Sequence, residues 1–204
     1  MLMLAVALGI FAGCAGFRLR GEVQSGRKEL LWGNPQKALG HFQRAAEIDP
    51  HYVIDFTDFE QGVWTYVGRA HYKMRELQKA REALERALRQ HPKDHLAHTY
   101  LAAVLLRQGR RESGMREAKS GLKSLGNWLQ YMDRYNPEGF YWDPGLKLEN
   151  RITELLGMIE GRDVSGAEMV SSLEWLGKEF EEEIDRVKED KMQDRDDDND
   201  SQSD

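Results

Sequence analysis

Two segments of the sequence repeat the same order of small, bulky and helix-breaking residues at identical offsets. The first copy carries Ala38, Phe42, Ala45 and Pro50, and the second carries Ala80, Leu84, Ala87 and Pro92. Helices that pack about 8 Å apart need small side chains at their contact points, and proline ends a helix because it has no N–H donor. The spacing therefore predicts pairs of closely packed antiparallel helices, and a chain that binds rather than catalyses.

The second copy extends upstream in a recognisable pattern. Trp64, Val67, Gly68 and the pair His71-Tyr72 occupy the first-helix positions of W-x2-L-G-x2-Y, so the chain resembles a tetratricopeptide repeat (TPR) protein. The resemblance implies an all-α, TPR-like helical-hairpin solenoid of about three repeats over residues 19–126, followed by C-terminal capping helices.

Glycines and the repeat length define the other copies. Gly33 stands where a tight turn between helices favours a positive φ, and Gly109 is its counterpart in a third, degenerate copy that lacks the proline. The offset between the two prolines is 92 − 50 = 42 residues, against a TPR period of about 34. We therefore expect about eight inserted residues at 51–60, forming a packed loop, and no strands.

The amino-terminal run 1–17 is uncharged and apolar and contains the only cysteine, Cys14. Phe11-Ala12-Gly13-Cys14 resembles a bacterial lipobox, which implies a signal peptide at 1–13, acylation of Cys14, a linker at 14–18 and an envelope location facing the periplasm. Ala15 resembles the outer-membrane class of lipoproteins. No basic residue precedes the run, so we expect the true start codon to lie upstream. An uncleaved anchor and a soluble cytoplasmic protein remain alternatives.

Residues 127–188 are expected to cap the repeats. The aromatic residues there are Trp128, Tyr131, Tyr135, Phe140, Tyr141 and Trp142, which either cover the end of the solenoid or form a partner-binding patch. Helical spacing predicts one helix up to Gly161, and Ser165 with Glu168 forms a capping box for another. Residues 189–204 are expected to be a disordered acidic tail, because 181–204 holds twelve acidic and four basic residues.

The sequence offers little for chemistry. It has no phosphate-binding glycine loop and no zinc-protease or esterase motif, so we expect no enzyme activity, cofactor or metal. A net charge of −6 disfavours nucleic acid.

The TPR resemblance implies a protein or peptide partner in the concave groove lined by the first helices of the repeats. The matching positions in this sequence are Thr65, Arg69, Tyr72, Lys73, Thr99 and Arg107. The chain is thus expected to be a lipid-anchored TPR adaptor for protein interaction or assembly at the bacterial cell envelope. A periplasmic solute-handling partner of a transporter and a cytoplasmic TPR co-factor are the alternatives.

Overall fold

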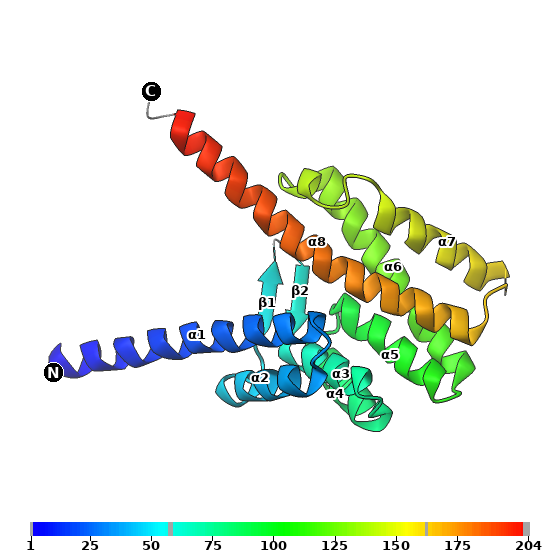
Figure 1. The fold of residues 1–204 in the computed structure, drawn as a ribbon, viewed down its shortest axis with the longest axis horizontal. Coiled ribbons are helices and arrows are strands. Elements are labelled where there is room, and N and C mark those ends of the chain that lie inside the picture. Colours follow the sequence, from blue (N-terminus) through cyan, green and yellow to red (C-terminus); the bar gives the residue numbers. More distant parts are fainter. Residues whose placement is uncertain (1, 57–58, 162, 202–204) are drawn as a thin grey trace. The chain divides into compact units, whose positions relative to one another are not determined.

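The computed structural model describes residues 2–56, 59–161 and 163–201, with side chains described within 15–196. Eight α-helices, one 3-10 helix and two short strands occur in these ranges (Figure 1). The expected all-α repeat architecture with C-terminal helices is confirmed. Contacts divide the chain into two units, Met1–Asp55 with Phe59–Ala97, and Phe56–Asp58 with His98–Asp204, and each is described on its own.

The first unit holds two helical hairpins. Helix α1 (Leu2–Leu31) packs on α2 (Pro35–Ile48), and α3 (Val63–Lys73) packs on α4 (Leu77–Gln90). The alanines of the repeated pattern, Ala38, Ala45, Ala80 and Ala87, are all completely buried. Figure 1 shows α1 and α2 side by side. The expected linker at 14–18 is part of α1, so the chain has no break there.

In each hairpin of the first unit, a glycine on the first helix packs against a bulky side chain on the second. A Cβ added to Gly26 of α1 would lie 2.5 Å from Phe42 of α2, and one added to Gly68 of α3 would lie 2.5 Å from Leu84 of α4. The two glycines are 68 − 26 = 42 residues apart, and the two bulky residues that they face are also 84 − 42 = 42 residues apart. The two hairpins therefore pack in the same register.

Three turns between paired helices share one geometry. Gly33, Arg75 and Gly109 have φ values of 81°, 65° and 76°. At each turn this residue donates to a carbonyl three residues back, and the next residue donates to a carbonyl five residues back, which is the Schellman motif. The turns are 75 − 33 = 42 and 109 − 75 = 34 residues apart, so the third copy has the ordinary TPR length and the insertion lies between the first two.

The inserted residues form a β-hairpin, which corrects the expectation of a loop without strands. Strand β1 (Val53–Phe56) pairs with β2 (Phe59–Gly62). Ile54 and Phe59 are buried and Asp55 is exposed, so the insert alternates as strands do. Four residues are too short a window for that alternation to stand out in the sequence.

A buried carboxylate joins β2, α3 and α5 (His95–Arg107). Asp94 accepts hydrogen bonds from the Gly62 N–H at 2.8 Å, the Thr65 hydroxyl at 2.6 Å and the Ala97 N–H at 2.9 Å. Burial raises the pKa of Asp94 above its ordinary value, and the three hydrogen bonds act in the opposite direction. Because Gly62 precedes α3 and Ala97 lies in the first turn of α5, the Asp94 side chain caps α5 and also holds the residue at the start of α3.

The second unit contains α6 (Arg111–Tyr135), which completes the third hairpin with residues 98–107 of α5, and three further elements. These are η1 (Gly139–Tyr141), α7 (Lys147–Gly161) and α8 (Gly166–Ser201). The predicted boundary at 126/127 lies inside α6, which ends at Tyr135, before Asn136-Pro137. The capping box is confirmed in part, since the Glu168 N–H donates to Ser165 Oγ at 3.1 Å.

The acidic tail departs from expectation, because α8 continues through 189–201 where the sequence predicts disorder. Contacts within the second unit account for the first part of this extension. Lys191 Nζ lies 2.5 Å from Glu138 Oε2, and Tyr141 donates a hydrogen bond to Asp194, which raises the pKa of Tyr141 to about 12. These partners are far away in sequence, so composition alone gives no indication of them.

We predict that Gly68→Ala destabilises the protein by about 1–3 kcal/mol, because its methyl group would overlap the buried Leu84. The control is Gly21→Ala in α1, where an added Cβ meets nothing within 4 Å and alanine should instead stabilise the helix by about 0.5–1 kcal/mol. Urea unfolding measures both variants. Equal stability of Gly68→Ala and wild type would contradict the packing register.

Asp94→Ala should lower the free energy of unfolding by about 2 kcal/mol or more, since it leaves buried donors without an acceptor. Lys93→Ala, at the exposed neighbouring position, should change it by less than about 0.5 kcal/mol. Thermal unfolding followed by circular dichroism makes the comparison. An unchanged melting temperature for Asp94→Ala would show that the carboxylate does not join these helices.

Candidate functional site

The predicted groove residues of α3 are mostly enclosed. Thr65 and Tyr72 are buried, and Arg69 is 3% exposed. The Thr65 hydroxyl is bound to Asp94, and Arg69 donates from Nη1 to Gln61 Oε1 at 3.2 Å while its guanidinium lies 5.1 Å from the centre of the Tyr66 ring. These three side chains are buried rather than lining an open groove, and Asp94 and the inserted strand β2 supply the internal partners of Thr65 and Arg69.

The other predicted groove residues are placed differently. Lys73 is exposed at the end of α3. Thr99 is buried on α5, and Arg107, at the end of α5, pairs with Glu174 of α8 at 2.6 Å. The structure thus groups Thr65, Arg69, Tyr72 and Lys73 on one helix of the first unit and places Thr99 and Arg107 in the second unit. A role of these six residues in partner binding stays a prediction.

Sequence reasoning missed a basic depression of about 440 Å³ over α3 and α4. Its cations are Lys79, Arg86 and Arg89, which we call the basic surface of α4. They are spaced by seven and three residues, so they share one face of the helix. This spacing is the sequence signal from which the basic surface could have been predicted. Trp64 and Val67 of α3 and Gln43 of α2 line the same depression.

The aromatic wall of this depression is fixed in place. The Trp64 indole N–H donates to the Pro50 carbonyl oxygen at 2.8 Å, which ties the ring to the end of the first repeat. The Arg86 guanidinium lies 3.6 Å from the centre of the ring, a distance at which cation–π attraction is strong. The depression therefore combines a rigid ring with positive charge.

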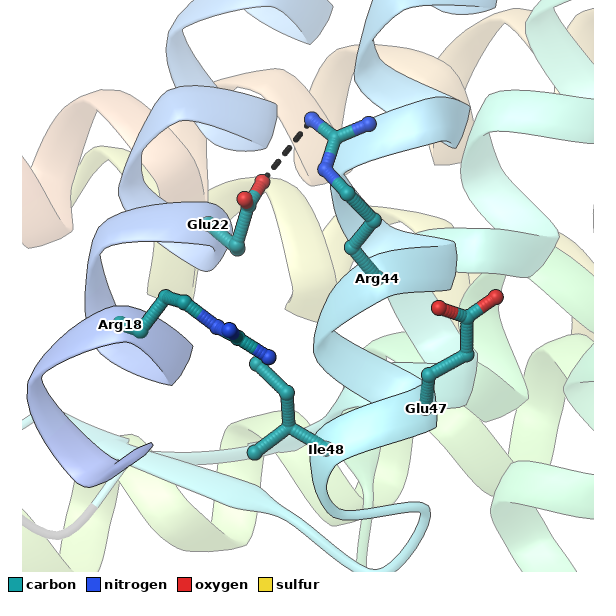
Figure 2. A pocket seen from close by; sticks show the side chains of 5 residues that line it. All are labelled: Arg18, Glu22, Arg44, Glu47 and Ile48. Atoms are coloured by element: carbon teal, nitrogen blue, oxygen red, sulfur yellow. Dashed lines mark ion pairs between the residues drawn. The ribbon is translucent and has the colours of Figure 1, made fainter. Parts of the chain in front are cut away.

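A second depression in the first unit has balanced charge. It has a volume of about 410 Å³ and is lined by Arg18, Glu22, Arg44, Glu47 and Ile48. Figure 2 shows Glu22 of α1 directed toward Arg44 of α2. Their oxygen and nitrogen atoms are 2.9 Å apart, and this hydrogen bond, followed by that from His41, lowers the pKa of Glu22. Two cations face two anions here, so this depression favours no ligand charge.

The second unit presents apolar surface of two kinds. A depression of about 360 Å³ is lined by Arg111, Glu112, Met115, Ile159 and Val164.

The aromatic segment is divided between buried and exposed rings. Trp128 and Trp142 are buried with ring centres 4.7 Å apart in a T-shaped pair, which supports a capping role. Tyr131, Tyr135 and Phe140 are exposed, so these rings remain available as a surface patch.

His41, His71 and His98 each pair with a glutamate. His71 and Glu76 are 2.6 Å apart in the second hairpin, and His98 pairs with Glu117 in the third. Within the described residues no group of three or more His, Cys, Asp or Glu side chains could hold a metal ion.

The amino-terminal prediction concerns Cys14, whose side chain lies outside the described residues. None of the helices in the described residues has both the length and the apolar character needed to cross a membrane.

Comparison with known families agrees with the helical hairpins. Residues 68–115 match the family described as tetratricopeptide repeat. The matched segment begins at Gly68 in α3, continues through α4 and α5 and ends early in α6, so it includes two of the three Schellman turns. No curated protein matches the chain. The family match and the repeated turn geometry together support tetratricopeptide repeats in this chain, and the match itself extends over residues 68–115.

Proposed function

We propose that this protein is an interaction adaptor, held at the bacterial cell envelope by lipid on Cys14, that binds partner proteins through its repeats. The tetratricopeptide match over residues 68–115 carries the adaptor part of the proposal, because such stacked helical hairpins present extended binding surfaces. Binding rather than catalysis is the activity proposed.

The sequence Phe11-Ala12-Gly13-Cys14 supports the anchor. Cleavage before Cys14 would place the acylated residue at the new amino terminus and leave the repeats on the periplasmic side. Two or more acyl chains would make this attachment stable, whereas one chain gives only marginal binding. Ala15, directly after the cysteine, favours the outer membrane as the destination.

Two measurements on the same intact cells test the lipid anchor and the adaptor function. Wild-type protein should fractionate with the envelope and carry an acylated Cys14 as its first residue, and Cys14→Ser should lose the acyl group and appear in the soluble fraction. Gly21→Ala, which keeps the cysteine, is the control. Lysine-directed crosslinking with mass spectrometry should join a recurring partner to Lys37, Lys79 or Lys93, exposed lysines of the repeat hairpins and their connections.

Two results would contradict the proposal separately. Soluble wild-type protein with residues 1–13 intact would exclude the lipid anchor. Reproducible crosslinks that come only from Lys147 and Lys178, on α7 and α8, or no recurring partner at all, would exclude an adaptor that works through its repeats.

A further inference from the structure

Within the described residues, two of the three cations in the basic surface of α4 lack the acidic partners that other arginines of the first unit have. Arg86 and Arg89 have no acidic partner in the part of the chain that the structure describes, whereas Arg44 pairs with Glu22, and Arg81 of the same helix pairs with Glu85. Lys79 lies 3.0 Å from Glu76 in an exposed pair, which contributes little to stability and can exchange partners.

The depression has a lining that suits a peptide. Val67 and Ala83 are buried, so they give it an apolar floor beneath the charges. Lys79 and Arg89 are ten residues apart on one helix, which corresponds to about 15 Å. An extended chain of about five residues covers that length, whereas a single free anion would meet only one end of it.

The side chains of the lining determine the chemistry of the ligand. The Arg86 guanidinium is stacked on Trp64, and a stacked guanidinium keeps N–H donors at its edge that match a carboxylate. Arg89 is exposed one turn further along α4. Glu82, also on the lining, receives a hydrogen bond from Gln78 at 2.7 Å. Of the α4 side chains that line the depression, three are cations and one is an anion, so the lining carries an excess of positive charge.

We propose that this depression binds an acidic, extended peptide segment of a partner protein, with its carboxylates on Lys79, Arg86 and Arg89 and its backbone against Trp64. The site lies over α3 and α4, apart from the buried Thr65 and Arg69 of the predicted groove. This assignment rests on the adaptor function, since it names the chemistry of the segment that the adaptor recognises.

Fluorescence anisotropy of purified full-length protein tests the proposal. The probe is a labelled peptide of about ten residues composed of Asp, Glu and Leu. Binding should weaken as salt rises from about 0.05 M to about 0.3 M, because exposed charge pairs are screened. The double variant Lys79→Glu with Arg89→Glu should bind at least about tenfold more weakly, a change of about 1.4 kcal/mol.

The matched control reverses two charges elsewhere in the first unit. Lys28→Glu with Lys37→Glu changes two exposed lysines of α1 and α2, so it alters net charge equally and should keep at least half of the wild-type affinity. Circular dichroism checks that both variants are folded. Equal weakening by the two variants, or no peptide binding by wild type, would overturn the proposal.

A second labelled peptide, with the sequence of residues 190–204, separates the possible occupants. Both acidic peptides should compete for the same site. If only the 190–204 peptide bound, the occupant would be the tail of a second copy, and the assignment to a separate partner would be wrong. Persistent crosslinks in cells without acidic-peptide binding would reject this inference and leave the adaptor function standing. Peptide binding without any cellular partner would reject the adaptor function and the assignment to a partner protein, and would leave only the preference of the depression for acidic peptides.

Discussion

The contact between a glycine on one helix and a bulky side chain on the next sets the geometry of the repeats. Gly26 with Phe42 and Gly68 with Leu84 leave no room for a Cβ, so each helix pair approaches as closely as backbone and side chain allow. The Schellman turn then reverses the chain within a few residues. With the hairpins fixed in this way, α4 presents Lys79, Arg86 and Arg89 along one line beside Trp64.

Asp94 adds a second constraint that the repeat pattern does not contain. Its carboxylate satisfies the starts of α3 and α5 together, and it also holds Thr65, a predicted groove residue, inside the protein. The inserted strand β2 has the same effect on Arg69 through Gln61. Thr65 and Arg69, which the resemblance would place against a partner, are thus used for internal hydrogen bonds, and we propose the basic surface of α4 as the interaction site instead.

Much of the fold could be predicted from the sequence, because the repeated alanines, Gly33, Gly109 and the Ser165 cap act through local geometry and fixed spacing. The hairpin at 53–62 could not, since strands of four residues carry too little alternation. The extension of α8 could not be predicted either, because Lys191 forms an ion pair with Glu138, more than fifty positions earlier in the sequence. The sequence indicated the basic surface only through the helical spacing of its three cations. It gave no sign that Trp64 lies beside them, because the hydrogen bond from Trp64 to the Pro50 carbonyl oxygen holds that ring in place.

A double-mutant cycle at Gly68 and Leu84 tests the packing claim most directly. Leu84→Ala alone should cost about 2–5 kcal/mol, because Leu84 is completely buried. If the two residues fill one space, adding Gly68→Ala to Leu84→Ala should cost at least about 1 kcal/mol less than Gly68→Ala costs in wild type. Unfolding free energies that add to within about 0.5 kcal/mol would show that the glycine contact does not set the repeat geometry.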